Sequence, residues 1–237
     1  MLFRSEIVVL TSGGYGPATI SQPVVITAIG IDASISVTTS GGNGITINTP
    51  GNVTLIGLNL HGEGMGNDGI LVQQVTFLRL FNVLIENFQM NGVDFEVSGN
   101  LAIYNSEMND NIVDGLEVNN ASANVYVENS SFDNNSVGAG VGSGQLAIAD
   151  SFATNNGSGF VSTGATLTLL NDRAAFNGTG LKVSGGGTLV FANCLIAGNT
   201  TAYSIASGSM AGTNPGTSLI APGQGTAGTL ATPITLQ

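Results

Sequence analysis

Short stretches in which apolar and polar residues alternate recur along most of the chain. Each begins with Gly or Ala and continues as an apolar-x-apolar triplet, at steps of 21 to 25 residues (Gly138 to Gly159 is 21, Gly44 to Gly69 is 25). This alternation has the period of a β-strand, and no segment extends it with the period of a helix. A fixed repeat of about 20–50 residues is typical of a repeat protein. The units open at Gly44, Gly69, Gly92, Gly115, Gly138, Gly159, Gly180 and Ala202.

Each unit contains two further apolar patches, separated by turns of Gly, Asn, Asp and Ser. In one unit these are Leu101-x-Ile103 and a third patch that ends at Met108. Three such short strands cannot bury an apolar face alone, but stacked coils can. At roughly 3.3 Å per residue, one unit suits a triangular coil whose strands pair in parallel with the next coil. The pattern therefore predicts an all-β fold, a single-stranded parallel β-helix (solenoid) with three short strands per coil and about 8–10 coils.

Asparagines recur at two corners of the predicted coil. Asn tolerates the left-handed backbone conformation and bonds to nearby backbone groups. We therefore expect each column to stack, with amide bonds passing from coil to coil. The column after the second strand is Asn105, Asn129, Asn171 and Asn193, and the column after the third strand is Asn87, Asn111, Asn134, Asn155, Asn177 and Asn199.

The unbroken repeat predicts one domain over residues 1–237, although this length could also form two domains. Residues 6–43 are expected to form entry coils, and residues 44–205 the regular coils. After residue 205 the repeat gives way to Ser, Gly, Thr, Ala and Pro. Because an open solenoid end exposes strand edges, residues 206–237 are predicted to be an irregular C-terminal cap, with a free linker as the alternative.

Three segments near the start of the chain resemble a known family. These segments are Ile7-Val8-Val9-Leu10, Gly14-Tyr15-Gly16 and Pro23-Val24-Val25-Ile26. With the repeats, they resemble the pectate-lyase-like right-handed parallel β-helix superfamily, and over about residues 7–205 the chain looks most like its mostly exported, uncharacterised bacterial repeat proteins. The resemblance implies the right hand and a secreted or cell-surface location. Met1-Leu2-Phe3-Arg4 lacks the features of a secretion signal, so we expect a leader upstream of the given sequence.

The charge of the chain excludes some partners. Four Lys and Arg stand against 15 Asp and Glu, for a formal net charge of −11. Nucleic-acid binding needs clustered basic residues, so we expect no nucleic acid, and cations are the natural counterpart of this field. No stretch reaches the roughly 18 apolar residues of a membrane span.

The single cysteine, Cys194, alternates with Ile196 and is expected to point into the core rather than to act as a nucleophile.

Carboxylates gather on the outer side of the first strand. With the coils in register, Asp94 and Glu117 are expected to lie about 5 Å apart. Ca²⁺ prefers such oxygen ligands, and like charges on neighbouring strands are unfavourable unless a cation or solvent screens them. Three interpretations stay open: solvated acids, a calcium site, or a catalytic pair of Asp94 and Glu117. The candidate metal ligands are Asp68, Asp94, Glu96, Asp114 and Glu117.

The enzymes that the fold resembles need groups that this region lacks. In the related polysaccharide lyases, acidic residues hold Ca²⁺ against an acidic sugar, and an Arg or Lys removes the proton. Here Arg79, Arg173 and Lys182 are expected on other strands or coils, and the motifs of the related polygalacturonases are absent. His61, the only histidine, is expected in a turn on another side. The sequence favours a non-catalytic exported or surface module that binds carbohydrate or is structural; the alternatives are a polysaccharide lyase or glycoside hydrolase with an unrecognised site, and a fibre component.

The remaining surface signal is apolar. Ile56, Phe81 and Tyr104 are expected to stack in one outward column of the second strand, with Leu84 around the corner. Such a patch suits another copy of the chain or the rings of a sugar. The alternative is a groove covered by a turn or by the C-terminal tail.

Overall fold

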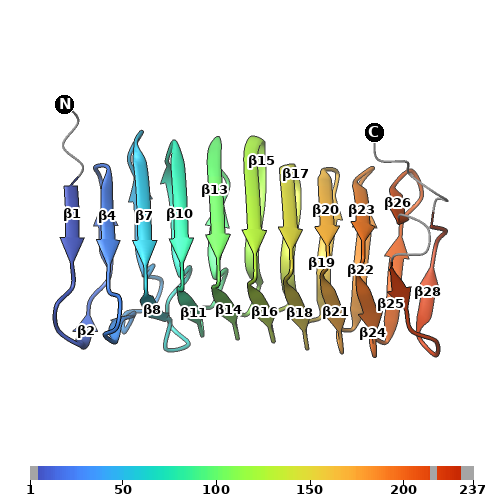
Figure 1. The fold of residues 1–237 in the computed structure, drawn as a ribbon, viewed down its shortest axis with the longest axis horizontal. Helices are drawn as coiled ribbons and strands as arrows, with labels where there is room; N and C mark the ends of the chain where they lie inside the picture. The colour runs from blue at the N-terminus through green and yellow to red at the C-terminus, as the bar shows by residue number, and fades with distance from the viewer. Residues whose placement is uncertain (1–4, 214–217, 231–237) are drawn as a thin grey trace.

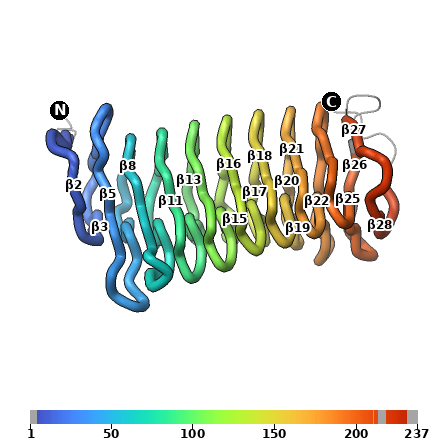
Figure 2. The backbone as a smooth tube through the Cα atoms, turned by 90° about the horizontal axis from the view of Figure 1, so that it is seen from below, coloured from blue at the N-terminus to red at the C-terminus, as the bar shows by residue number. Residues whose placement is uncertain are grey.

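The computed structural model describes residues 5–213 and 218–230, and in these ranges the chain is all β, without a helix. Its coils lie side by side along one axis, from the N-terminal coil to the C-terminal coil (Figure 1). The tube in Figure 2 shows the same path as a series of stacked turns. Every coil pairs in parallel with the next, and the third strands of the coils form a ten-stranded sheet. This confirms the predicted parallel β-solenoid with three strand positions per coil.

The strands fall into three groups by their place in the coil. First strands are β3 (Ala18–Ile20), β6 (Ile45–Asn48), β9 (Ile70–Gln74), β12 (Val93–Phe95), β19 (Ser158–Thr163), β22 (Thr179–Ser184), β25 (Thr201–Ile205) and β28 (Gly225–Ala227). Second strands are β1 (Ser5–Val8), β4 (Val24–Thr27), β7 (Asn52–Ile56), β10 (Phe77–Phe81), β13 (Gly99–Tyr104), β20 (Thr166–Leu170), β23 (Thr188–Ala192) and β26 (Met210–Thr213). Third strands are β2 (Gly13–Tyr15), β5 (Ala33–Ser36), β8 (Leu58–His61), β11 (Leu84–Glu86), β14 (Glu107–Asn109), β16 (Ser131–Asp133), β18 (Phe152–Thr154), β21 (Arg173–Ala175), β24 (Leu195–Ala197) and β27 (Leu219–Ile220).

In two central coils the first and second strands are not separate. β15 (Asp114–Glu128) and β17 (Val137–Ala149) each run through both positions, with irregular register near the bend between them. The sequence predicted two short strands here. Pairing continues up to the bend on both sides, since Asn119 of β15 pairs with Ser143 of β17 and Asn124 pairs with Gln145. Between them, Gly144 takes the turn with a φ of 95°.

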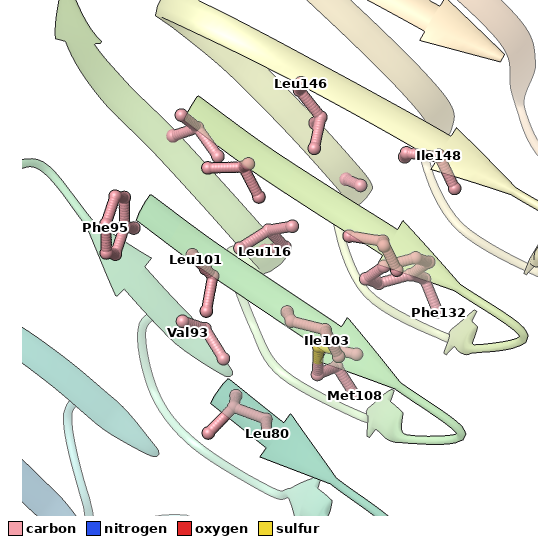
Figure 3. Close-up of a cluster of buried hydrophobic side chains, with 14 of the residues drawn as sticks. Leu80, Val93, Phe95, Leu101, Ile103, Met108, Leu116, Phe132, Leu146 and Ile148 are labelled. Atoms are coloured by element: carbon pink, nitrogen blue, oxygen red, sulfur yellow. The ribbon is translucent and has the colours of Figure 1, made fainter. Parts of the chain in front are cut away.

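Inward side chains from all three strand positions form one continuous core. Figure 3 shows part of it, where Leu80, Val93, Leu101 and Met108 come from different strands and point toward the axis. Alternating burial along the strands follows the period of two that the sequence displayed. Cys194 is buried, as predicted, and burial raises the pKa of its thiol to about 12.

The glycine that opens each unit is required by close contact between coils. A Cβ atom on Gly115 would lie 2.6 Å from the carbonyl oxygen of Gly138, and the same clash recurs at the other glycines of the column. Ala202 is tolerated at the last position because the ladder skips a residue there: Thr201 pairs with Gly225, and Tyr203 with the adjacent Thr226. The repeated glycine is therefore a packing requirement.

The asparagines after the second strand stack at a left-handed corner, as expected. Asn105, Asn129, Asn171 and Asn193 all have positive φ, as does Asp150 between them. Asn129 Nδ2 donates to Asn105 Oδ1 at 2.6 Å. The expected coil-to-coil amide bond is therefore present, although the acid in the column breaks the run of asparagines.

The predicted column after the third strand is wrong, because it merges two adjacent columns. Asn87, Asn134 and Asn155 occupy a left-handed corner. The next residue in each of these coils is buried: Phe88 after Asn87, and an asparagine in the later coils. From Asn111 on, these inward residues form a ladder, in which the backbone N–H of Asn156 donates to Asn177 Oδ1 and Asn156 Nδ2 donates to the Phe132 carbonyl. The ladder consists of Asn111, Asn135, Asn156, Asn177, Asn199 and Gln224. Spacing in the sequence did not separate the two columns because they differ by one residue.

The described part of the C-terminal segment continues the solenoid. β26, β27 and β28 pair with β23, β24 and β25, so they add strands at all three positions. This differs from the irregular segment expected after residue 205, because the Gly/Ser/Thr-rich strands lack the apolar alternation that marked the other coils. The rest of that segment, residues 214–217 and 231–237, lies outside the described residues.

A substitution in the glycine column tests this packing. We expect Gly115→Ala to lower the free energy of unfolding by about 1–3 kcal/mol or more, because the new methyl group meets backbone that cannot move without breaking register. Urea unfolding followed by circular dichroism measures the loss. Gly14→Ala is the matched control, since a Cβ there has no neighbour within 4 Å, and it should be neutral or slightly stabilising. Equal midpoints for the two variants would contradict the requirement.

Candidate functional site

The acidic residues of β12 and β15 meet on the outer face of the first strands. Asp94 pairs directly with Glu117 across the two coils, as the repeat register predicted. One carboxylate oxygen each from Asp94, Glu96 and Glu117 lies within 4.8 Å of the other two. We call these three residues the acidic cluster. Of the five candidate ligands, the structure brings these three together.

The other two candidates, Asp68 and Asp114, lie at the corner before the first strand. They stack on either side of Asn91, which is buried. The backbone N–H of Asn91 donates to Asp68 Oδ1 at 3.0 Å, and the backbone N–H of Asp114 donates to Asn91 Oδ1 at 3.1 Å. Asn91 Nδ2 also donates to Glu117 Oε2 at 3.0 Å. This asparagine therefore links the corner to the acidic cluster and fixes the position of Glu117.

Burial and mutual repulsion make these acids hard to ionise. Burial raises the pKa of Asp94 to about 7, and the charges of Asp68, Glu96 and Glu117 add to it. Burial, followed by the charge of Glu117, raises the pKa of Asp114 to about 7. Asp94 Oδ1 is buried and has no hydrogen-bond partner among the described residues. The cluster thus holds a carboxylate whose charge nothing in the described chain neutralises.

No described basic residue lies beside the acidic cluster. Lys182 shares its column but is three coils away, because Glu117 pairs with Gly140, Gly140 with Val161, and Val161 with Lys182. The Arg79 guanidinium lies 3.6 Å from the centre of the Phe77 ring on the second-strand face. His61 is on the third-strand sheet, where its Nδ1 is 2.8 Å from Glu86.

A second feature lies on the outer face of the second strands. The rings of Phe81 and Tyr104 stack with centroids 5.0 Å apart and an interplanar angle of 10°. Tyr126 meets Tyr104 edge-on, with centroids 6.0 Å apart. Ile56 pairs with Phe81 in the expected column. Leu84 is separate, since its neighbours on the third-strand sheet are Asn59 and Glu107; the expected patch therefore continues to Tyr126 instead.

Beside these rings runs a shallow groove of about 290 Å³. One row of its wall is formed by Asn100, Asn124, Gln145 and Thr166, which pair in succession across four coils. Ala102 and Ala147 flank Tyr126 in the next row. None of the lining residues carries a charged side chain: they are Phe77, Asn100, Leu101, Ala102, Tyr104, Asn124, Val125, Tyr126, Gln145, Leu146, Ala147, Thr166 and Thr168. We call this surface the aromatic groove.

Sequence reasoning found only part of the aromatic groove. Tyr104 was visible as a member of an apolar column, but Tyr126 occupies the next column and its ring reaches sideways to Tyr104. The amide row was available in the sequence as Asn100, Asn124 and Gln145, which lie two residues before Ala102, Tyr126 and Ala147, in an outward column that the sequence analysis did not consider. Considering single columns, rather than neighbouring columns together, concealed the groove.

Comparison with known proteins agrees with the geometry. The model of a family described as "Right handed beta helix region" matches residues 27–151, which is 125 of 237 residues. The chain belongs to this right-handed β-helix family. A solved structure titled "Crystal structure of pectate lyase Pel9A" is similar over 98% of this chain and 70% of that chain, with a TM-score of 0.59 and 13% identity. This likeness shows a shared fold. No curated protein matches the sequence.

The family assignment supplies the right hand of the β-helix, which the resemblance had implied. The described residues contain no helix of the length and apolarity that a membrane span needs.

The raised pKa values predict how the stability of this β-helix depends on pH. Folded Asp94 and Asp114 keep their protons up to about pH 7, whereas the unfolded chain loses them near the ordinary value of 3.8. The protonated Asp94 and Asp114 therefore contribute to the stability of the folded state fully below about pH 3.8, and this contribution is lost as the pH rises through 7. Asp172 is buried, and burial raises its pKa to about 7 as well, so it adds to the effect of the half-buried Asp94 and Asp114.

We therefore expect the melting temperature to fall between pH 5 and pH 8, and Asp94→Asn to reduce the slope and raise stability at pH 8. Thermal unfolding in matched-salt buffers measures both effects. Glu63→Gln, an exposed acid away from the acidic cluster, is the control and should leave the slope unchanged. A wild-type melting temperature that rises steadily over this range would contradict the assignment.

Proposed function

We propose that this chain is a non-catalytic β-helix, exported or held at a cell surface, that binds polysaccharide. The observation that supports this function is the aromatic groove, in which the half-buried ring of Tyr104 and the exposed ring of Tyr126 stand beside a row of amides. Sugars present apolar C–H faces and many hydroxyl groups, so they suit a surface of rings with neighbouring donors and acceptors.

The contacts of the groove fit this chemistry. Tyr104 and Tyr126 meet at an interplanar angle of 60°, so their faces form an angled platform rather than a flat stack. Successive members of the amide row are about 4.8 Å apart along the axis, because that is the spacing of paired strands. Ala102 and Ala147 have short side chains and leave the space beside Tyr126 open.

The absence of catalysis is supported by what surrounds the acidic cluster. A lyase mechanism needs a base near the bound sugar, and the nearest basic residue in the same column, Lys182, is three coils from Glu117. An acid and a base at a glycosidic bond need environments that push their pKa values apart. Here burial raises the pKa of both Asp94 and Glu117. A lyase or hydrolase remains the alternative function, and product formation separates it from binding.

Binding to glycans tests the proposal. On an array of soluble polysaccharides, we expect wild-type protein to bind at least one and to produce neither new reducing ends nor ultraviolet-absorbing unsaturated ends. Tyr104→Ala and Tyr126→Ala should each weaken binding about tenfold, since a lost aromatic contact costs about 0.5–1.5 kcal/mol beyond its buried area.

Phe152→Ala is the matched control, because Phe152 is an exposed aromatic residue on the third-strand sheet. It should leave binding unchanged. Turnover of any substrate would favour the enzyme alternative. A concentration-dependent dimer that Tyr104→Ala abolishes, without glycan binding, would assign the surface to a second copy of the chain.

A second candidate, calcium binding at the acidic cluster, is favoured by the unpartnered Asp94 Oδ1 among three carboxylates within 4.8 Å. Carboxylate oxygens are the ligands that Ca²⁺ takes. If Ca²⁺ binds, millimolar CaCl₂ should raise the melting temperature at pH 8, where the acids are ionised, and have little effect at pH 5. Asp94→Asn with Glu117→Gln should remove the effect, and Glu107→Gln on the third-strand sheet should not. Equal responses of all three proteins would exclude the site.

A further inference from the structure

We infer that the aromatic groove selects an uncharged glycan, laid along the axis of the β-helix, and rejects acidic polysaccharides. This rests on the proposed function, because it specifies the ligand of the same groove. Four observations carry it: the charges of the lining, the chemistry of the amide row, the position of Glu128, and the direction of the row.

The lining offers nothing that would neutralise an acidic sugar. In a chain with 19 charged Lys, Arg, Asp and Glu residues (4 and 15), none lines the groove. A buried or half-buried carboxylate needs a paired cation or several donors to offset its lost hydration. The described cation closest in register is Arg79, which pairs with Ala102 at one end of the groove and stacks on Phe77.

The charge that does stand beside the rings is negative. Glu128 pairs with Tyr104 on one side and Ala149 on the other, and its Oε2 accepts a hydrogen bond of 3.1 Å from the Tyr126 hydroxyl. A uronate or sulfate group seated on these two rings would face this carboxylate. The net charge of −11 repels polyanions at longer range as well.

The amide row matches hydroxyl groups better than carboxylates. Each Asn or Gln amide both donates and accepts, and a Thr hydroxyl does the same. A sugar hydroxyl also donates and accepts, so it can use both ends of each amide. A carboxylate only accepts, which would leave the amide oxygens of Asn100, Asn124 and Gln145 without donors on binding.

The row also sets the direction of the bound chain. Asn100, Asn124, Gln145 and Thr166 lie on four successive coils, so the row runs across the strands, parallel to the axis, for about 14 Å, that is three spacings of about 4.8 Å. The Tyr104 and Tyr126 rings lie toward the N-terminal end of the row. An extended oligosaccharide therefore stacks on the rings at this end and bonds to amides along the rest.

Affinity electrophoresis and calorimetry with defined polysaccharides test the inference. The probes are a neutral set (xylan, galactan, glucomannan and a β-glucan) and an acidic set (polygalacturonate and alginate), each with EDTA and with Ca²⁺. We expect binding to at least one neutral probe, with less than a twofold change in affinity between 50 and 500 mM NaCl. The acidic probes should not bind in either condition.

Variants locate the contact. Asn124→Ala and Gln145→Ala should each weaken the neutral complex about three- to tenfold, whereas Gln73→Ala, an exposed amide on the first-strand face, should not. Arg79→Gln should also leave it unchanged, since Arg79 has no acidic group to pair with in a neutral ligand. Circular dichroism of each variant confirms that the fold is intact.

The outcomes separate the inference from the proposed function. Binding of an acidic probe that Arg79→Gln or EDTA abolishes would overturn the neutral-ligand inference and leave polysaccharide binding intact. If a neutral polysaccharide binds with the same affinity to wild type and to all groove variants, the assignment of the groove would be overturned. Binding of no probe in either set would overturn both.

Discussion

The structure depends on the coil-to-coil register of parallel backbone hydrogen bonds. Shifting one coil by a single residue would turn its inward side chains outward, so the core permits only one alignment. The opening glycines reinforce this alignment, because at Gly115 the backbones of two coils approach too closely for a side chain. The buried amide ladder does the same at another corner, where Asn156 bonds to the coils on both sides. The inward side chains, the opening glycines and the buried amide ladder thus all serve to hold the coils in one alignment.

The outer columns are free of that constraint, and their composition decides what the surface can do. Residues about 23 positions apart in the sequence become neighbours, so a few substitutions per coil can build a continuous strip. The first-strand face gathers Asp94 and Glu117, while the second-strand face gathers Tyr104, Tyr126 and uncharged amides. Two neighbouring faces of one solenoid therefore have opposite chemistry: one concentrates negative charge, and the other has a groove without charged lining residues.

The sequence predicted the fold and the pairing of Asp94 with Glu117, because a fixed repeat determines which residues overlie one another. It did not distinguish the corner position of Asn87 from the inward position of Asn111, which comes one residue later in its coil. Both positions recur with nearly the same repeat length, and only the backbone conformation separates them. It also missed the strands after residue 205, whose small polar residues carry no alternation. The link from Tyr104 to Tyr126 crosses two columns and depends on side-chain reach, which repeat spacing does not contain.

On the acidic face, the register brings carboxylates together although they repel one another, and neighbouring groups reduce that repulsion. Stacking places Asp94 beside Glu117 whether or not their charges suit each other. Asn91 offsets part of the repulsion by donating to Glu117, but Asp94 Oδ1 receives no such bond from the described residues. Near pH 7 a proton on Asp94 relieves the repulsion, and a divalent cation would relieve the same repulsion from the same oxygen atoms. Protons and cations must therefore compete for this face, so any cation affinity of the cluster falls as the solution becomes acidic.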